Sequence, residues 1–416
     1  KILLVSQYFW PESFIINDLV KTLTSQGHSV KVLTGKPNYP DGNVFNGYSE
    51  EGIEEELFEK NISIFRVPLR PRKTGGAKNL FLNYWSFIWN GLRFFPDAVK
   101  NENYDVIFVF ALSPITMAIP AIYLKWKLKT HLAIWVQDLW PESLSATGFI
   151  KNRFLLSLVR LLVRGIYSGA DTLLVQSKGF IEPVSRYADV KKIIYYPNSY
   201  RDEYLGVNQS TAQIKDNTLP IKLTDLLERF FCVTFAGNLG TAQSLETIVD
   251  AATKLKHVPN LRIVLVGSGA LFDWLLEQKE KRKLDNLVLA GRFPSEVMPQ
   301  IFQLSDALLV TLKKEEIFSY TVPSKVQAYL ASSRPIIAAL DGEGARVIED
   351  ASAGLTCGSE DVNGLVDCIE NLYHMTDMEK QKMSESGRAY YLKHFEMGSQ
   401  AKRLVEILDN RLVENG

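Results

Sequence analysis

The chain has 416 residues, 46% of them hydrophobic, which is enough apolar material for two domains with separate cores. Lysine and arginine together number 47, as do aspartate and glutamate, so the net charge is zero. This balance, without long runs of one sign, excludes the basic surface typical of nucleic-acid-binding proteins.

The sequence contains no motif typical of a metal site or a cofactor site. The cysteines Cys232, Cys357 and Cys368 lack metal-ligand spacing, none of the five histidines pairs at such spacing, and no Asp-x-Asp occurs. Residues 1–5 are too short for the apolar region of a signal peptide. We therefore expect free thiols in a reducing, cytoplasmic compartment, with no metal and no cofactor.

The first elements in the chain predict a Rossmann-like domain. Residues 2–6 form an apolar strand, a helix follows through about residue 25, and residues 30–34 form a second strand. The turn after the first strand lacks the GxGxxG pattern, so nothing here indicates a nicotinamide cofactor.

Two apolar stretches raise the question of a membrane. Residues 106–124 carry no charge, but Pro114 divides them into a strand and a helix start, which argues against a membrane span. Residues 80–95 are rich in aromatic residues and carry Arg93 as their one charge. We expect a core helix there, in preference to a helix that lies in a membrane interface.

A basic amphipathic helix is predicted over residues 149–167. Lys151, Arg153, Arg160 and Arg164 stand among its leucines and valines. This helix either rests on anionic lipid or packs between domains with a solvated basic side, and the sequence leaves both readings open.

The tetrapeptide Trp-Pro-Glu-Ser occurs twice, at residues 10–13 and 140–143, and each copy follows a predicted strand. Because the carboxyl ends of parallel strands form the ligand-binding edge of an α/β sheet, we expect both copies at that edge. Glu12, Asp138 and Glu142 are therefore the candidate catalytic carboxylates. The alternative is that both copies are ordinary helix starts, with proline and glutamate in the first turn.

The domain boundaries follow from composition. Residues 193–197 form a strand that ends at Pro-Asn, and residues 207–219 are polar, as in a linker. We expect an N-terminal domain over residues 1–206, a linker over 207–225 and a second domain over 226–389. A closing helix is expected over residues 390–416, packed on the first domain.

The second domain contains two motifs suited to a phosphate. Gly237-Asn238-Leu239-Gly240 follows a strand and lets backbone approach a ligand closely. Thr321-Val322-Pro323-Ser324-Lys325 opens a helix over 325–331, with Thr321 as its expected N-cap, and brings free N–H groups and an ammonium to one point. An ordinary loop with a solvated lysine is the alternative. The expected donor-binding residues are Gly237, Asn238, Gly240, Arg292, Tyr320, Thr321, Ser324, Lys325 and Gln327.

The succession FFCVTFAGNLG (230–240), VPSKVQAYLASSRPIIAAL (322–340) and GEGARVIEDASAGL (342–355) resembles the C-terminal half of the GT-B glycosyltransferases, in particular retaining family four. The resemblance implies an α/β fold with two Rossmann-like, doubly wound domains facing a cleft, and a C-terminal helix that crosses back to the first domain. It also implies transfer from a nucleotide-sugar donor to an acceptor.

The Pro-Ser-Lys, Tyr-Leu-Ala and Arg-Pro-Ile pieces resemble the branch that builds bacterial surface polysaccharides, and within it the N-acetyl-L-fucosamine transferases of O-antigen assembly. By this resemblance the donor is a UDP-sugar, such as UDP-N-acetyl-L-fucosamine. The acceptor is a sugar on undecaprenyl diphosphate, and the protein lies on the inner face of the plasma membrane.

This chain departs from the family pattern at the residues that usually carry charge. Two family glutamates fall on Tyr320 and Ala328, a family arginine and lysine fall on Asn238 and Gln243, and a family histidine falls on Gln137.

A diphosphate still needs a counter-charge, and Lys325 and Arg292 are the remaining cations in suitable loops. We expect a divergent metal-independent transferase with its phosphate charge at Lys325 and a first-domain carboxylate at Asp138. The alternatives are an inactive sugar-nucleotide-binding subunit and, with less support, an NAD(P)-dependent oxidoreductase.

Overall fold

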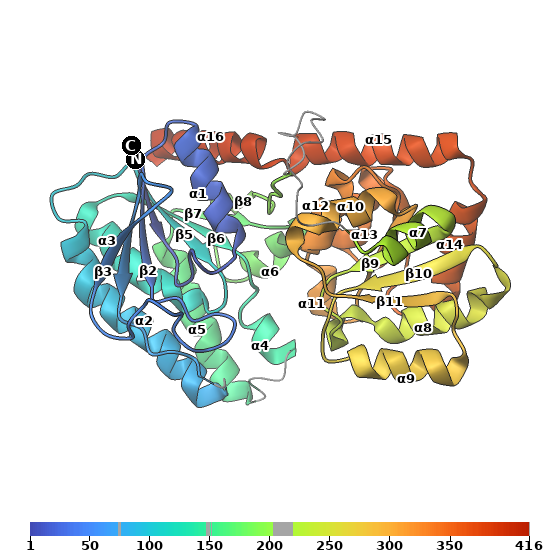
Figure 1. Ribbon diagram of the computed structural model, residues 1–416. Coiled ribbons are helices and arrows are strands. Elements are labelled where there is room, and N and C mark those ends of the chain that lie inside the picture. Colours follow the sequence, from blue (N-terminus) through green and yellow to red (C-terminus); the bar gives the residue numbers. More distant parts are fainter. Residues whose placement is uncertain (74–75, 147–149, 151, 203–218, 416) are drawn as a thin grey trace. The chain divides into compact units, whose positions relative to one another are not determined.

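The computed structural model describes residues 1–73, 76–146, 150, 152–202 and 219–415. The chain forms two compact units. Unit 1 contains Lys1–Ser199 and Met397–Gly416, and unit 2 contains Tyr200–Glu396. Each unit is a Rossmann-like layer structure in which helices cover a mostly parallel sheet (Figure 1).

The sheet of unit 1 has the strand order β3-β4-β2-β1-β5-β6-β7-β8, and only the β3–β4 pair is antiparallel. Its central strands are almost wholly apolar and are buried on both faces, as parallel strands between two helical layers must be. The strands are β1 (Ile2–Val5), β2 (Val30–Gly35), β3 (Glu54–Phe58), β4 (Ile62–Val67), β5 (Val106–Ala111), β6 (His131–Val136), β7 (Thr172–Val175) and β8 (Ile193–Tyr195).

Two helical layers cover this sheet. α1 and α16 pack together on one face, where they share a core with side chains of β1, β2 and β5. α2, α3 and α5 lie on the other face (Figure 1). The helices are α1 (Ile15–Ser25), α2 (Ala77–Ala98), α3 (Ile119–Leu128), α4 (Glu142–Ala146), α5 (Arg153–Gly169), α6 (Ile181–Ser185) and α16 (Met397–Asn415).

The sheet of unit 2 is wholly parallel, with the order β11-β10-β9-β12-β13-β14. Its strand order reverses between β9 and β12, which makes the carboxyl ends of these two strands the switch point where α/β proteins bind ligands. The strands are β9 (Phe231–Ala236), β10 (Leu261–Val266), β11 (Leu287–Gly291), β12 (Ala307–Thr311), β13 (Ile336–Ala339) and β14 (Gly354–Cys357).

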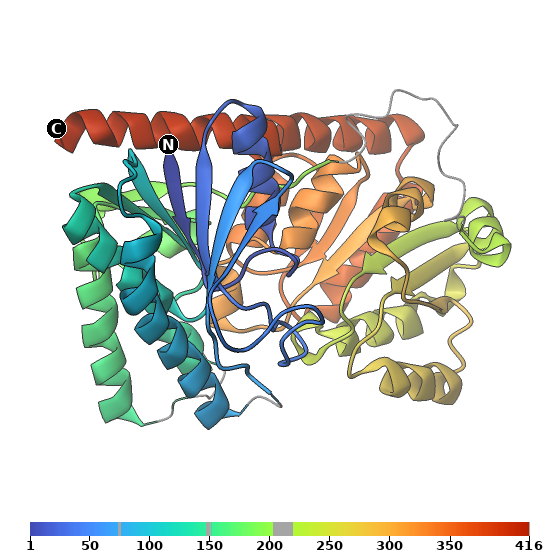
Figure 2. The same ribbon diagram turned by 60° about the vertical axis from the view of Figure 1, so that its left-hand side comes forward.

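The helices of unit 2 lie on both faces of its sheet (Figure 2). They are α7 (Ile221–Arg229), α8 (Leu245–Lys254), α9 (Phe272–Arg282), α10 (Met298–Leu304), α11 (Glu316–Ser319), α12 (Ser324–Ala331), α13 (Glu343–Asp350), α14 (Val362–His374) and α15 (Asp377–His394).

Two of the expected boundaries are wrong. The closing helix expected from residue 390 is really two helices, α15 and α16, which are separated at Phe395 and Glu396. α15 packs on α12 in unit 2, whereas α16 belongs to unit 1. Residues 221–225 of the expected linker begin the helix α7, which packs on β9 because Leu223 and Leu227 are buried. Residues 207–218 of that linker lie outside the described residues.

The apolar stretch over residues 106–124 is a strand followed by a helix, as expected, because β5 ends at Ala111 and α3 begins at Ile119. Among the described residues, no helix has both the length and the apolar character needed to cross a membrane.

Candidate active site

Three glycines end neighbouring strands at the carboxyl edge of the sheet in unit 2. Gly237, Gly267 and Gly291 follow or end β9, β10 and β11, with φ of 136°, 145° and 82°. A Cβ atom on Gly267 would lie 1.8 Å from the carbonyl oxygen of Gly237, so only glycine permits this approach of the two loops. At the carboxyl ends of β9 and β10, a ligand would therefore meet the backbone of Gly237 and Gly267 and no side chain of these two residues.

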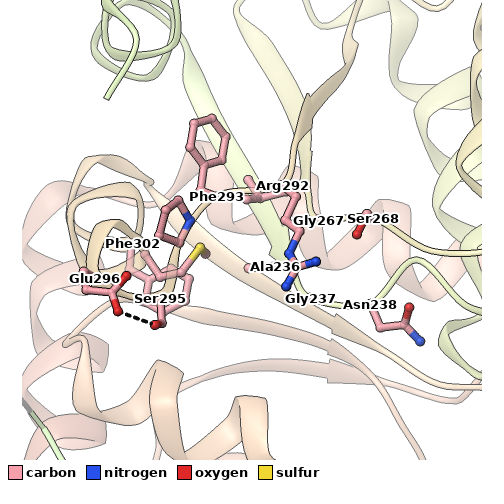
Figure 3. Close-up of a pocket in the computed structure, with 13 residues that line it drawn as sticks. Ala236, Gly237, Asn238, Gly267, Ser268, Arg292, Phe293, Ser295, Glu296 and Phe302 are labelled. Atoms are coloured by element: carbon pink, nitrogen blue, oxygen red, sulfur yellow. Dashed lines mark hydrogen bonds between the residues drawn. The ribbon is translucent and has the colours of Figure 1, made fainter. Parts of the chain in front are cut away.

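A cavity of 960 Å³ opens at this edge (Figure 3). Its volume is in the range of small-molecule sites in proteins. Loops after β9, β10 and β11 supply polar groups, and α10 supplies apolar ones. It is lined by Ala236, Gly237, Asn238, Val266, Gly267, Ser268, Arg292, Phe293, Pro294, Ser295, Glu296, Met298 and Phe302.

Lys325, in the first turn of α12, lies directly beside Gly237. A Cβ atom on Gly237 would lie 2.7 Å from Cε of Lys325. The ammonium group donates to Oε1 of Gln243 at 2.5 Å and lies 3.7 Å from the ring centroid of Phe235. Among the described residues no carboxylate pairs with it, and burial lowers its pKa to about 7. Lys325 is thus a desolvated cation without an anion, placed at the switch point of the sheet.

Two buried side chains fix the start of α12. The Tyr329 hydroxyl accepts from the backbone N–H of Ala236 at 3.1 Å and donates to the carbonyl oxygen of Leu309 at 3.3 Å. The side-chain amide of Gln327 can donate to the carbonyl oxygens of Pro323 and Ser324 at 3.0 Å. α12 is therefore tied to the ends of β9 and β12, and the position of Lys325 is fixed with it.

The expected N-cap of α12 is wrong. Pro323 occupies the cap position, and the Thr321 hydroxyl instead donates to the carbonyl oxygen of Phe318 at 3.1 Å. The helix consequently starts at Ser324 and has no side-chain acceptor for its first N–H groups. The N–H of Val326 donates to the carbonyl oxygen of Pro323 at 2.9 Å, so the N–H groups of Ser324 and Lys325 are the ones that could serve another acceptor, such as a phosphate oxygen.

The structure brings together only part of the expected donor-binding set. Gly237, Asn238 and Arg292 line the cavity, and Lys325 touches the first of them. Gly240 packs against the side chain of Asn238. The others hold their own segment: Tyr320 donates to Glu316, Thr321 and Gln327 bond to nearby carbonyl oxygens, and Ser324 is exposed.

Sequence reasoning missed the contacts of Gln243 and Tyr329 and the burial of Glu343. By the resemblance, Gln243 stands where the family has a lysine. The structure shows in addition that its side-chain oxygen accepts from the ammonium of Lys325. Glu343 is a 9% exposed carboxylate at the start of α13. Its neighbour Gly342 packs so tightly that a Cβ atom there would lie 2.1 Å from the carbonyl oxygen of Ser319. The signal available in the sequence was a glutamate between two glycines, Gly342 and Gly344, directly after a predicted strand.

Asp138 lies at the carboxyl edge of the sheet in unit 1, two residues after β6. Burial raises its pKa, against hydrogen bonds from the side chains of Ser143, Ser113 and Trp140. Ser113 follows β5, and the strand order of this sheet reverses between β1 and β5. Asp138 is therefore held next to the switch point of unit 1 by groups from two loops.

The other two candidate carboxylates make more local contacts. Glu142 begins α4, and its Oε1 accepts from the Tyr187 hydroxyl at 3.1 Å. Glu12 is 2% exposed and accepts the backbone N–H groups of Asn38 and Tyr39 at 2.8 Å and of Phe9 at 3.2 Å. Burial raises the pKa of Glu12 to about 7.

The contacts of Glu12 join two loops at the sheet edge, which favours a structural role over a catalytic one. Asp138 and Glu142 both lie near the buried Tyr167 hydroxyl, whose pKa is raised first by burial and then by these two carboxylates.

Comparison with known proteins assigns each unit to a family. The model described as "Glycosyl transferase 4-like domain" matches residues 14–198, and the model described as "Glycosyl transferases group 1" matches residues 231–375. The first match lies in unit 1 and the second in unit 2. The chain belongs to the GT-B glycosyltransferases.

Two curated relatives of this glycosyltransferase carry transferase names. WcaI of Escherichia coli (strain K12), named as a colanic acid biosynthesis glycosyl transferase, is 24% identical over 76% of each chain. WbjE of Pseudomonas aeruginosa, named as a glycosyltransferase, is 27% identical over 61% of this chain and 60% of that one.

Solved structures confirm the GT-B fold of the glycosyltransferase. Sucrose-phosphate synthase from Thermosynechococcus elongatus aligns with a TM-score of 0.73 at 14% identity, over 99% of both chains. HepE of Anabaena in complex with UDP aligns with a TM-score of 0.65 at 12% identity, over 99% of this chain and 100% of that one.

Proposed function

We propose that this glycosyltransferase moves a sugar, with retention of anomeric configuration, from a UDP-sugar to a lipid-linked sugar acceptor in bacterial surface polysaccharide synthesis. The single observation that carries the proposal is Lys325, a partly buried lysine beside the glycine loop of unit 2, for which the described residues supply no carboxylate partner. A diphosphate is the kind of ligand that would supply the missing charge. The UDP complex of HepE, which shares the fold, supports the same choice.

Unit 2 would bind the donor. The ammonium of Lys325 and the backbone N–H groups of Ser324 and Lys325 would face the diphosphate, and the Gly237 and Gly267 backbone would permit its close approach. Arg292, at the rim of the cavity, would add a second cation. These groups would stabilise the negative charge that develops on the diphosphate as the glycosidic C–O bond breaks.

Unit 1 would bind the acceptor sugar. Asp138 would orient the acceptor hydroxyl, which forms the new C–O bond at the anomeric carbon as the bond to UDP breaks and gives up its proton to the departing diphosphate. The carboxylate would also favour positive charge at that carbon in the transition state. Glu142 is the second carboxylate in the same part of the unit.

The sugar and the setting are proposed from resemblance. The name of WcaI refers to colanic acid, a polysaccharide, and the Pro-Ser-Lys branch points to O-antigen assembly with UDP-N-acetyl-L-fucosamine as a candidate donor. The acceptor would be a sugar on undecaprenyl diphosphate, which places the enzyme in the cytoplasm at the inner face of the plasma membrane.

A panel of nucleotide sugars tests the proposal. The true donor should raise the melting temperature of the protein, because it binds the folded state alone. With a lipid-linked acceptor present, the same donor should release UDP. Stabilisation without UDP release from any lipid-linked acceptor would favour a binding subunit, and stabilisation by NAD alone would contradict the proposal.

The affinity for UDP should fall as the pH rises above 7. The pKa of Lys325 in the free protein is about 7, whereas a paired lysine needs its proton, so binding must take up a proton at higher pH. Calorimetry between pH 6 and pH 9 should show affinity falling by up to roughly tenfold per unit. A Lys325→Met variant should show weak, pH-independent binding, and an unchanged affinity for the parent across this range would contradict the role of Lys325.

Activity should be unaffected by EDTA. The described residues contain no group of three or more histidine, cysteine, aspartate or glutamate side chains arranged to hold a metal ion. Lys325, Arg292 and the helix start would stabilise the leaving diphosphate in its place. Turnover before and after chelation is the measurement, and loss of turnover that Mg²⁺ or Mn²⁺ restores would overturn this expectation.

A further inference from the structure

The outer side of α2 carries an aromatic stripe that the proposed reaction does not use. Phe81, Trp85 and Trp89 recur every four residues and are 63%, 54% and 60% exposed. The rings of Phe81 and Trp85 are stacked, with centroids 6.4 Å apart. The expected core position of residues 80–95 is thus correct only for the inner side of the helix, where Phe87 is buried.

The helix α5 has three distinct sides. Its inner side is buried and consists of Leu156, Val163, Ile166 and Tyr167. A second side carries Arg153, Arg160 and Arg164, which share one direction because their spacings of seven and four residues correspond to about two turns and one turn. The third side is apolar and exposed, and includes Phe154, Leu158 and Leu161. Lys151, the fourth basic residue expected here, lies outside the described residues.

α2 and α5 belong to one layer of unit 1, with α3 packed against both. Glycines bring the helices close: a Cβ atom on Gly91 of α2 would lie 2.8 Å from Pro120, and one on Gly169 of α5 would lie 3.0 Å from Ile122. Figures 1 and 2 show α2 and α5 side by side, starting at the same end of the unit. We call the exposed residues Phe81, Trp85, Trp89, Phe154, Leu158 and Leu161 the aromatic face.

The charged residues of α2 and α5 are almost all basic. α2 contributes Lys78 and Arg93, and α5 contributes its three arginines. Within these two helices, both described in full, the only acidic residue is Asp97, in the last turn of α2. Tryptophan at the border of an apolar surface, flanked by basic residues, is the pattern of helices that lie in the interface of an anionic membrane.

We propose that the aromatic face docks on the surface of an anionic lipid bilayer, with α2 and α5 lying against the headgroups. The aromatic rings enter the interface, and the arginines of α5 neutralise lipid phosphates. The inference deepens the proposed function, on which it rests for the choice of a membrane as partner, because a lipid-linked acceptor is reached at a bilayer.

Sedimentation with lipid vesicles tests the docking surface without any sugar substrate. The parent should bind vesicles that contain phosphatidylglycerol and bind neutral phosphatidylcholine vesicles weakly. Replacing Phe81, Trp85 and Trp89 by serine should reduce partitioning by roughly tenfold or more. The matched control replaces three other exposed apolar residues, Ile221, Met378 and Val413, by serine. It should bind vesicles as the parent does.

The charges are tested by a second variant. Replacing Arg153, Arg160 and Arg164 by glutamine should weaken binding to phosphatidylglycerol vesicles and reduce its dependence on salt. This variant also keeps the test decisive if the serine variant does not fold.

UDP binding, measured by calorimetry for every variant, separates this inference from the proposed function. The proposed UDP site lies in unit 2, whose residues are the same in the parent and in the α2 and α5 variants. Loss of vesicle binding with UDP binding intact supports the docking surface. Equal partitioning of parent and variants overturns it, even if glycosyl transfer is observed. A serine variant that loses self-association in sedimentation velocity while keeping its vesicle binding would also overturn it, and would make the face an interface between copies.

Discussion

Lys325→Ala should weaken UDP binding by roughly ten- to a hundredfold at pH 6, where the lysine of the parent is charged, because hydrogen bonds to ionised groups contribute about 1.5–3 kcal/mol. The ammonium lies against Gly237 and has no carboxylate partner among the residues that the structure describes, so a bound diphosphate would be its main counter-charge. Calorimetry with UDP is the measurement.

Lys314→Ala is the matched control for this prediction. Lys314 is an exposed lysine that follows β12 in the same unit, so its loss removes the same charge without touching the glycine loop. We expect it to bind UDP as the parent does. If the two variants behaved alike, the diphosphate site would have to lie elsewhere in unit 2.

The loss of Lys325 should not destabilise the folded state. The folded-state pKa of about 7 lies below the ordinary value of 10.5, so the unfolded chain binds more protons between these two values. Stability of the parent therefore rises with pH across this window, and the cost of the buried charge is fully present below pH 7. A melting curve of the variant at pH 6 at or above that of the parent would show that weak UDP binding is not the result of misfolding.

Asp138→Asn should lower turnover by roughly a hundredfold or more, the range for one electrostatic contributor in a dry site, and leave UDP binding unchanged. The substitution keeps the shape of the side chain and removes its charge. Ser113, Trp140 and Ser143 hold the carboxylate in place from two loops, and partial burial raises its pKa. Rates of UDP release at saturating donor are the measurement.

Asp171→Asn is a suitable control for lost stability. Asp171 lies at the opposite edge of the same sheet, where it accepts from the backbone N–H of Leu132 at 2.9 Å and pairs with Lys125 at 2.6 Å. Both variants should lower the melting temperature modestly, since each weakens a buried hydrogen bond. If Asp138→Asn melted earlier and turned over normally, Asp138 would be a structural residue like its control.

Much of the fold could be predicted because buried parallel strands are recorded directly in the sequence as apolar runs. The expected strand over residues 131–136 is β6 itself, and the helix expected over 325–331 begins one residue earlier as α12. The two Rossmann-like domains follow from such runs together with the glycine and proline residues between them, whereas the GT-B assignment came from the resemblance.

The site was less predictable because its main contact joins distant residues. Gln243 and Lys325 are separated by 82 positions and meet only when β9 and α12 pack together. This contact also bears on the resemblance, by which a family lysine falls on Gln243. The ammonium of Lys325 lies 2.5 Å from the side-chain oxygen of that glutamine.

The exposed side of α2 was also beyond sequence reasoning. The helix is apolar on nearly every side, so its periodicity cannot separate the side that packs on the sheet from the side that meets solvent. The burial of Phe87, Ile88 and Phe95 and the close packing of Gly91 on Pro120 show which side is turned inward.

Unit 2 is one uninterrupted segment of the chain, and its two ends lie side by side. The backbone N–H of Tyr200 donates to the carbonyl oxygen of Phe395 at 2.8 Å, and the backbones of Tyr200 and Glu396 form an isolated parallel β-bridge. The flanking ends of unit 1 also meet, since the Ser199 hydroxyl lies 3.2 Å from the sulfur of Met397. Unit 2 therefore has the form of a cassette inserted into a host domain. Exchanging residues 200–396 between relatives at this one paired junction should transplant sugar preference without rebuilding the host's core.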